Sequence, residues 1–458
     1  MNIIDNDLLS IQEARILVEN AATSQKTLAG YPQEKLDEIA MAIVSAITPH
    51  IERLANLSYE ETDYGNVQDK YTKIRFTCDK LLPAIRDMKC VGIINRDHEN
   101  KIMDVGVPMG VIAAFCPVTS PVATTIYKAV IAVKSGNAII FSPHPRAKES
   151  MTETLDLIIE AAIQAGLPKW SISYQTITTG AGSTELMNHK DTSLIMLTGV
   201  PGLLKIAQSS GKATIIGGLG NGPAFIERTA DVDRAVRDII ISKTFDYGIV
   251  TAAEQSVVVD SCIESDVRRA FEMHGGYFMS AAESDALGLF FFSGAGKANP
   301  DMVGISAQRL AKKAGFLVPD SVKVLISEQK YVSQKNPYSR EKLCPVLSYF
   351  VEDDWMNACE KCIELILGER QSHTLVIHSR DEEVIKQFAL KKPVGRILVN
   401  TPAVFGGMGA TTNLFPAMTL GSASVGQGIT SENVSPMNLV YIRKVGYGVR
   451  TAEEILYQ

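Results

Sequence analysis

Apolar residues recur every three to four positions through the first part of the chain, which is the spacing of helices that bury one face. The pattern predicts helices over residues 8–30, 33–57 and 59–88, and we expect these helices to pack as one layer. Two short strand-like segments follow, at 91–96 and 101–108. They predict a two-stranded hairpin.

Beyond residue 110 the pattern changes, because short continuous apolar runs alternate with helical segments. Strands that are apolar on both faces and alternate with helices are typical of a doubly wound parallel sheet. The strands expected in this first sheet are 111–116, 138–141, 172–177, 193–197, 214–216 and 223–226.

A second alternation of strands and helices follows the segment around Thr251 and indicates a second α/β domain. Its strands are expected at 257–259, 287–292, 322–326, 343–351, 374–378 and 395–400. Residues 401–433 are rich in Gly, Thr, Ser and Pro, which predicts a loop. A last strand at 439–443 and a short helix at 451–457 are expected to close the chain.

Composition and charge are typical of a globular protein with two or three domains, since 46% of the 458 residues are hydrophobic and 21% are charged. The net charge of −6 argues against nucleic acid or a membrane surface as a partner. No uncharged apolar stretch reaches about 18 residues, so no membrane-spanning helix is predicted. The N-terminus lacks a basic start and an apolar signal core, and we therefore expect a cytoplasmic protein.

The seven cysteines are odd in number and widely spread, which indicates reduced thiols rather than a disulfide framework. Cys359 and Cys362 are spaced as C-x-x-C, but they lie in an apolar helical pattern that favours two buried helix cysteines. No second cysteine pair or histidine cluster accompanies them in the sequence. No metal site is therefore predicted.

Several motifs, taken together and in order, resemble the aldehyde dehydrogenase superfamily. They are FSPHPRA (141–147), GLGN (218–221), SKTFD (242–246), EQS (254–256), EKLCPV (341–346), HT (373–374) and TLG (419–421). The chain is more closely similar to the CoA-acylating branch, which oxidises an aldehyde to an acyl-CoA with NAD. The resemblance extends over nearly the whole chain.

The resemblance implies an α/β fold of two doubly wound domains and a small β-hairpin. The NAD-binding domain would comprise residues 1–90 and 108–225, and the oligomerisation hairpin residues 91–107. The catalytic domain would comprise residues 226–410, and a C-terminal return segment residues 411–458. The implied substrate is a small aldehyde or acyl-CoA, with coenzyme A as co-substrate, and the implied assembly is a homodimer or homotetramer.

The resemblance also assigns eight residues to the dinucleotide, which would be NAD, with NADP not excluded: Ser142, Pro143, His144, Thr198, Gly199, Gly218, Gly220 and Glu341. The first three would hold the adenosine end, and the next two would lie near the pyrophosphate. The other two glycines would let the backbone approach the reacting centre. The glutamate would accept hydrogen bonds from the nicotinamide ribose.

Three residues are assigned to catalysis: Thr251, Ser120 and His373. Thr251 stands where the family has its nucleophilic cysteine, and Ser120 stands where the family has an asparagine that stabilises the oxyanion. A threonine hydroxyl is far less acidic than a thiol and needs an adjacent base. For His373 two interpretations stay open, a proton carrier for the CoA thiol or a structural histidine.

The glycine segment 217–221 lacks the glutamate base with which ordinary aldehyde dehydrogenases activate water, and this agrees with transfer of the acyl group to CoA. Three interpretations of the whole chain stay open. Thr251 is a substitution in a competent acylating dehydrogenase, or the chain is a catalytically silent nucleotide-binding or structural subunit. In the third interpretation Cys116 carries out related redox chemistry, although a buried strand cysteine is the simpler reading of it.

Overall fold

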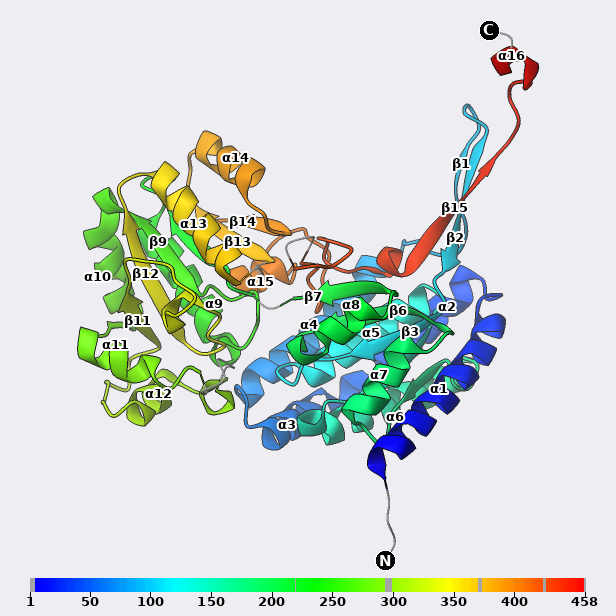
Figure 1. Ribbon diagram of the computed structural model, residues 1–458, viewed down its shortest axis with the longest axis horizontal. Coiled ribbons are helices and arrows are strands. Elements are labelled where there is room, and N and C mark those ends of the chain that lie inside the picture. Colours follow the sequence, from blue (N-terminus) through cyan, green and yellow to red (C-terminus); the bar gives the residue numbers. More distant parts are fainter. Residues whose placement is uncertain (1–4, 219, 293–298, 370–372, 423–425, 457–458) are drawn as a thin grey trace, which may run out of the picture.

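The computed structural model describes residues 5–218, 220–292, 299–369, 373–422 and 426–456. Two α/β lobes lie side by side, and an antiparallel arm extends away from one of them (Figure 1). The expected α/β architecture is therefore confirmed. None of the helices among the described residues is both long enough and apolar enough to cross a membrane.

The first lobe is built on a five-stranded parallel sheet in the order β5-β4-β3-β6-β7. Its strands are β3 (Val111–Phe115), β4 (Ala138–Ser142), β5 (Ile172–Tyr174), β6 (Thr192–Thr198) and β7 (Ala213–Gly217). Every residue of β3 and β4 is buried, as the continuous apolar runs predicted.

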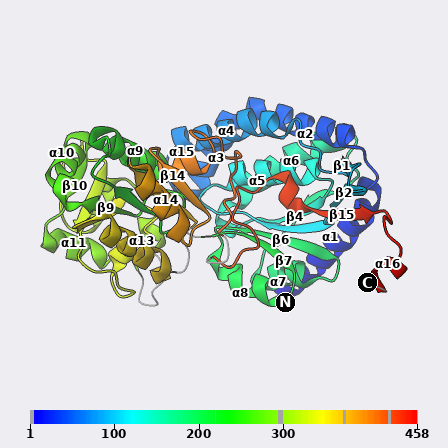
Figure 2. The ribbon, with the colours of Figure 1, turned by 90° about the horizontal axis from the view of Figure 1, so that it is seen from above.

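Helices cover both faces of this sheet (Figure 2). One face carries α2 (Gln33–Ile47), α4 (Val67–Ile85), α5 (Pro121–Lys134) and α6 (Lys148–Gln164). The other carries α1 (Asn6–Leu28), α7 (Gly180–Asn188) and α8 (Leu204–Ser209). The strands are thus shielded from water on both sides, which is what a doubly wound sheet requires.

The expected long helices over 33–57 and 59–88 are interrupted. A 3-10 turn, η1 (Thr48–His50), contains Pro49 and separates α2 from α3 (Ile51–Thr62), because proline lacks the N–H that would continue the α-helical ladder. Asp63 then adopts a left-handed conformation, with φ of 53°, and ends α3. The Asn66 side chain accepts a hydrogen bond from the Asp69 N–H and starts α4.

The second lobe holds a seven-stranded parallel sheet in the order β10-β11-β12-β9-β8-β13-β14. Its strands are β8 (Pro223–Ile226), β9 (Ser256–Asp260), β10 (Gly276–Phe278), β11 (Val324–Glu328), β12 (Val346–Glu352), β13 (Thr374–His378) and β14 (Arg396–Val399). Its helices are α9 (Val232–Thr244), α10 (Glu264–His274), α11 (Ala281–Gly288), α12 (Ala307–Lys313), α13 (Trp355–Glu369) and α14 (Glu382–Lys391).

Two strand predictions were wrong. The segment 223–226 does not complete the first sheet, because β8 pairs with β9 and β13 in the second. The segment 287–292 is not a strand: α11 runs through its first residues, started by a capping box in which Ser280 and Glu283 satisfy each other's backbone N–H. Leu287 and Phe291 are four positions apart and both buried, which helical and strand patterns can share over so short a run.

The arm consists of three antiparallel strands, β1 (Gly92–Asp97), β2 (Ile102–Pro108) and β15 (Val440–Gly446), with β2 in the centre. The hairpin prediction is confirmed, and the last predicted strand joins it. A short helix, α16 (Glu453–Leu456), follows. The segment predicted as a loop also contains a short helix, α15 (Ala403–Gly407).

Candidate active site

Thr251 lies in the turn that joins α9 to β9. After α9 the chain passes through η4 (Phe245–Gly248), in which Asp246 and Tyr247 both adopt left-handed backbone conformations. Left-handed backbone at two consecutive non-glycine residues costs about 1–3 kcal/mol each and persists only where surrounding contacts hold it. The turn that leads to Thr251 is therefore held in its conformation by surrounding contacts.

Thr251 faces a cavity between the two lobes. The lining comes from both lobes and from the C-terminal loop: Pro117, Thr119, Ser120, Thr124, Thr198, Gly199, Gly217, Gly218, Ile249, Val250, Thr251, Met408, Ala417, Met418 and Leu420. The first-lobe part of this wall stands at the carboxyl ends of β3, β6 and β7, where doubly wound sheets bind ligands. The Thr124 hydroxyl is buried and has no hydrogen-bond partner among the described residues. The structure thus brings Thr251, Ser120, Thr198, Gly199 and Gly218 together around one cavity.

His373 contacts the Thr251 hydroxyl from the second lobe. Its Nε2 lies 3.1 Å from Oγ1 of Thr251, and its Nδ1 lies 2.7 Å from Oγ1 of Thr374. Nη1 of Arg396 is 3.4 Å from the same Nδ1 and also donates to Oγ1 of Thr374 at 3.2 Å. The direction of the contact with Thr251 depends on the tautomer of His373: a hydrogen on Nε2 makes the imidazole donate to the hydroxyl, and a hydrogen on Nδ1 leaves Nε2 to accept from it.

Burial and the nearby Arg396 charge both favour the neutral imidazole, and they lower the pKa of His373 to about 3. Arg396 is itself buried, which lowers its pKa to about 10. Its side chain donates to carbonyl oxygens of His373, Gly421 and Ser431 at 2.9–3.0 Å. The guanidinium thereby ties β14 to the loops around the site.

The glycine segment packs directly against the backbone of Thr251. A Cβ atom at Gly220 would lie 1.7 Å from the Thr251 carbonyl oxygen, so no other residue fits there without a shift. The Gly220 N–H donates to Oε1 of Glu341 at 2.7 Å. Glu341, which the resemblance assigned to the nicotinamide ribose, is thereby placed beside the glycine segment.

A second cavity, of about 370 Å³, lies at the carboxyl end of β4. Ser142, Pro143 and His144 line it, together with Thr179 and Gly202. The His144 Nδ1 accepts a hydrogen bond from the backbone N–H two residues on, and burial lowers the pKa of this imidazole. The loop after β6 separates the two cavities.

Gly199, in that loop after β6, has φ of 62°, and a Cβ there would lie 2.7 Å from Pro117. Only glycine fits this turn readily. Gly199 lines the cavity of Thr251, and the next residue, Val200, lines the cavity at β4. The two cavities are therefore neighbours along the sheet edge.

Cys116 lines the cavity at β4 rather than that of Thr251. It is buried, and this burial raises the pKa of its thiol. The Thr125 hydroxyl donates to its sulfur at 3.7 Å. These observations support the structural interpretation of Cys116. Among the described residues no group of three or more His, Cys, Asp or Glu side chains could hold a metal ion.

Two lysines were missed in the sequence, although both stand beside the site. Lys70 and Lys73, one turn apart on α4, are buried against Asp246. The sequence did contain a signal for them, because the two lysines share the buried face of α4 with Ile74 and Thr77. Such a pair needs a partner, and the sequence did not show which segment would supply it.

The sequence model of the aldehyde dehydrogenase family matches residues 4–274. The acetylating succinate-semialdehyde dehydrogenase of Clostridium kluyveri is 32% identical over 450 residues, which are 98% of this chain and 98% of that protein. The chain belongs to the aldehyde dehydrogenase family. The bifunctional aldehyde-alcohol dehydrogenase AdhE of Escherichia coli K12 is 37% identical over 98% of this chain and 50% of that protein. The chain thus spans about half the length of this curated relative.

Solved structures of aldehyde dehydrogenases match nearly the whole chain. A probable aldehyde dehydrogenase from Listeria monocytogenes EGD-e matches with a TM-score of 0.96 and 47% identity, over 99% of this chain and 100% of that one. An acetylating aldehyde dehydrogenase from Geobacillus thermoglucosidasius matches with a TM-score of 0.94 and 41% identity, over 98% and 99%. The family resemblance and the fold expected from it are confirmed.

Proposed function

We propose that this aldehyde dehydrogenase oxidises a short aldehyde to an acyl-CoA with NAD, with Thr251 at the nucleophile position. The observation that carries the proposal is that Thr251 and Ser120 line one cavity, next to a second cavity at β4. The segment 217–221 contains no acid that could activate water. An acyl group on residue 251 would therefore await another acceptor, for which the names of the acetylating relatives suggest CoA.

The residues at β4 fit a dinucleotide. The cavity of about 370 Å³ is large enough for an adenosine, and Gly199 lets the backbone turn closely beside it. Ser142, Pro143 and His144 would hold the adenosine end, and Thr198 and Gly199 would lie near the pyrophosphate. A bound dinucleotide would accept the hydride that oxidation of the aldehyde releases. NADP is the alternative dinucleotide, and a homodimer or homotetramer formed through the arm is the proposed assembly.

The protein's own part is to bind the aldehyde carbonyl and stabilise its oxygen. When the side chain of residue 251 attacks the carbonyl carbon, the carbonyl oxygen takes up the negative charge. The hydroxyl of Ser120 is a candidate donor to it, because Ser120 lines the same cavity. Gly218 and Gly220 allow the backbone to approach this centre.

A second function, a catalytically silent nucleotide-binding subunit, is favoured by one observation. The imidazole of His373 faces the Thr251 hydroxyl, but its pKa of about 3 makes it a weak base for removing the proton of that hydroxyl. A threonine without a base is a poor nucleophile. It would also form an oxygen ester, which transfers its acyl group to CoA less readily than a thioester.

The test is NADH formation from acetaldehyde and CoA, by this chain and by Thr251→Cys, with Thr251→Ala as the control. For an acylating dehydrogenase impaired at one position, we expect Thr251→Cys to raise the rate by about 10² or more, since a thiol needs no separate base. No NADH from either protein, with NAD still raising the unfolding temperature, would support the silent subunit. Activity that survives Thr251→Ala and disappears in Cys116→Ser would contradict both functions.

A further inference from the structure

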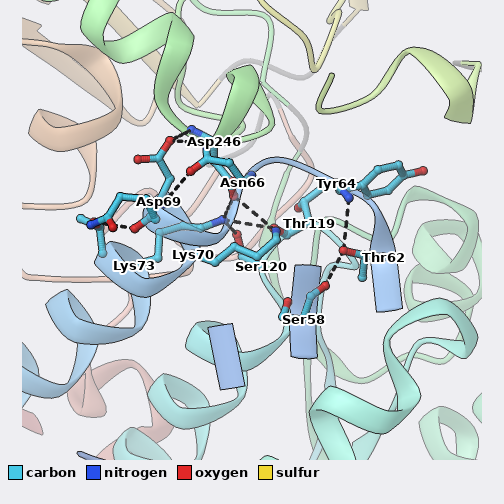
Figure 3. Close-up of polar contacts among 12 residues, drawn as sticks. Ser58, Thr62, Tyr64, Asn66, Asp69, Lys70, Lys73, Thr119, Ser120 and Asp246 are labelled. Carbon is cyan, nitrogen blue, oxygen red and sulfur yellow. Dashed lines mark hydrogen bonds and ion pairs between the residues drawn. The ribbon is translucent and has the colours of Figure 1, made fainter. Parts of the chain in front are cut away.

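A buried charge cluster joins the two lobes next to Ser120, which lines the cavity of Thr251 (Figure 3). Lys70 and Lys73 come from α4 of the first lobe, and Asp246 comes from η4 of the second. The two lysines are 2% and 1% exposed, and the aspartate is 0% exposed. One carboxylate thus faces two amines in the interior.

The ammonium group of Lys73 contacts three acceptors. Its Nζ donates to Oγ of Ser120 at 2.6 Å and to the carbonyl oxygen of Thr119 at 3.1 Å, and it forms an ion pair with Oδ2 of Asp246. An ammonium has three N–H donors and no acceptor. Ser120 must therefore accept from Lys73, so its own O–H points elsewhere. Because Ser120 lines the cavity of Thr251, that O–H is available to the cavity.

Asp246 is held from both sides, which fixes the position of Lys73. The backbone N–H of Asn66 donates to Oδ1 of Asp246 at 2.8 Å, and the backbone N–H of Asp246 donates to Oδ2 of Asp69 at 2.7 Å. A Cβ at Gly65 would lie 1.7 Å from the Asp246 carboxylate. The left-handed conformation of Asp246 is the local cost of this arrangement.

Lys70 makes the same kind of contacts without reaching Ser120. Its Nζ lies 3.5 Å from Oδ2 of Asp246 and 3.5 Å from the carbonyl oxygen of Thr119. Burial lowers the pKa of Lys70 to about 8. The two lysines thus share a carboxylate and a carbonyl, and they differ in the contact with the serine hydroxyl.

We propose that Lys73 is a positioning residue for the oxyanion donor: its ammonium orients the Ser120 O–H into the cavity and polarises it. The inference rests on the proposed function, because it concerns acyl chemistry at residue 251. A hydroxyl that accepts from a cation donates more strongly, and a donor fixed in advance needs no reorganisation when charge develops. Lys73 and Ser120 together therefore take the place of the asparagine amide that the family has at this position.

The test is acylation of Thr251→Cys by p-nitrophenyl acetate, which needs neither dinucleotide nor CoA. The thiolate forms a carbon–sulfur bond, the carbonyl oxygen passes through an oxyanion, and p-nitrophenolate leaves. Alkylation of the same sulfur by iodoacetamide displaces iodide without an oxyanion. The measured quantity is the ratio of the two rates at position 251, followed by peptide mass spectrometry because the chain has other cysteines.

We expect Lys73→Met to lower this ratio by about 10²-fold, the low end of the range for losing an oxyanion donor. Ser120→Ala should lower it by a similar factor, and Lys73→Met added to Ser120→Ala should change it by no more than about twofold further. The matched control is Lys70→Met, which also removes a partner of Asp246 but leaves the contact with Ser120. Should Lys73→Met not fold, Lys73→Met with Asp246→Asn removes both members of the ion pair.

Four outcomes would overturn the proposal. The ester and iodoacetamide rates could fall together, which is the behaviour of a purely structural lysine. Lys70→Met could lower the ratio as much as Lys73→Met, or Lys73→Met could keep its full effect in Ser120→Ala. Thr251→Cys could also react with iodoacetamide but resist the ester, and the site would then stabilise no oxyanion. Failure of the proposed function would appear separately, as absent NADH formation.

Discussion

The imidazole of His373 and the hydroxyl of Thr251 are joined by a 3.1 Å hydrogen bond between Nε2 and Oγ1. Arg396 lies 3.4 Å from Nδ1 of the same imidazole, and burial together with this charge lowers the pKa of His373 to about 3. This arrangement holds the oxygen of residue 251 in place. An imidazole with so low a pKa is a weak base for removing the proton of that oxygen.

The first prediction concerns the pH dependence of nucleophile reactivity in Thr251→Cys. Since burial and Arg396 lower the pKa of His373 to about 3, no imidazolium forms that could stabilise a thiolate. We expect the iodoacetamide rate to rise with pH along a single limb at or above about 8.5, the ordinary value for cysteine. His373→Gln, which keeps an N–H donor, should preserve that limb. A limb near pH 6 that His373→Gln removes would show that the histidine acts as a base.

The second prediction concerns Arg396→Lys. Arg396 donates to three carbonyl oxygens and, through Nε, to the Asn433 side chain at 3.0 Å. A lysine ammonium has three N–H groups without the guanidinium fork, so buried acceptors lose their donors. We expect the free energy of unfolding in urea to fall by about 3 kcal/mol. Arg380→Lys, at an exposed ion pair with Asp231, should change it by less than about 0.5 kcal/mol. Equal losses of unfolding free energy in Arg396→Lys and Arg380→Lys would contradict the proposed structural role of Arg396.

The third prediction concerns the cavity at β4. A Cβ at Gly202 would meet no atom within 4 Å, so Gly202→Leu can project a side chain into the cavity without a backbone clash. At about 100 times the dissociation constant, NAD should stabilise the parent chain by about 2.7 kcal/mol. Gly202→Leu should lose this stabilisation, measured by thermal unfolding, while Gly202→Ala keeps it. An unchanged NAD effect in Gly202→Leu would place the dinucleotide elsewhere.

The fourth prediction concerns the acid side of the stability curve. Burial lowers the pKa of His378 from 6.5 to about 4, so the unfolded chain takes up the proton first as the pH falls. The stability contributed by the neutral, buried imidazole of His378 is fully present above pH 6.5. It is lost as the pH falls from 6.5 to 4, at about 1.4 kcal/mol per pH unit. We expect His378→Leu to reduce the pH slope of urea unfolding by about this amount.

His373 titrates in the same window, so part of the slope should remain in His378→Leu. Glu254 has the opposite sign, because burial raises its pKa to about 7 and its contribution is lost as the pH rises. The control is His98→Leu, at an exposed position in the turn between β1 and β2. Parallel pH dependences for His378→Leu and the parent chain would contradict the prediction.

Local patterns were sufficient for most of the secondary structure. The buried strands β3 and β4 stand out as continuous apolar runs, and the hairpin of β1 and β2 was visible from two short strands around a polar turn. The wrong strand predictions arose where the local sequence pattern fits more than one structure. The run 287–292 suits a helix and a strand equally, and β8 was placed in the wrong sheet because strand partners are chosen by contacts far apart in sequence.

The sequence by itself determined the family and the two α/β domains, and its family resemblance gave the expectation that Thr251 stands at the nucleophile position. These depend on motifs and periodicities that are local in the chain. Only the tertiary structure decided which side chains surround Thr251. His373 reaches it from a distant segment, Arg396 contacts that histidine, and Lys73 reaches Ser120 across 47 positions. The protonation of a buried group depends on burial and on its partners, which no single stretch of sequence contains.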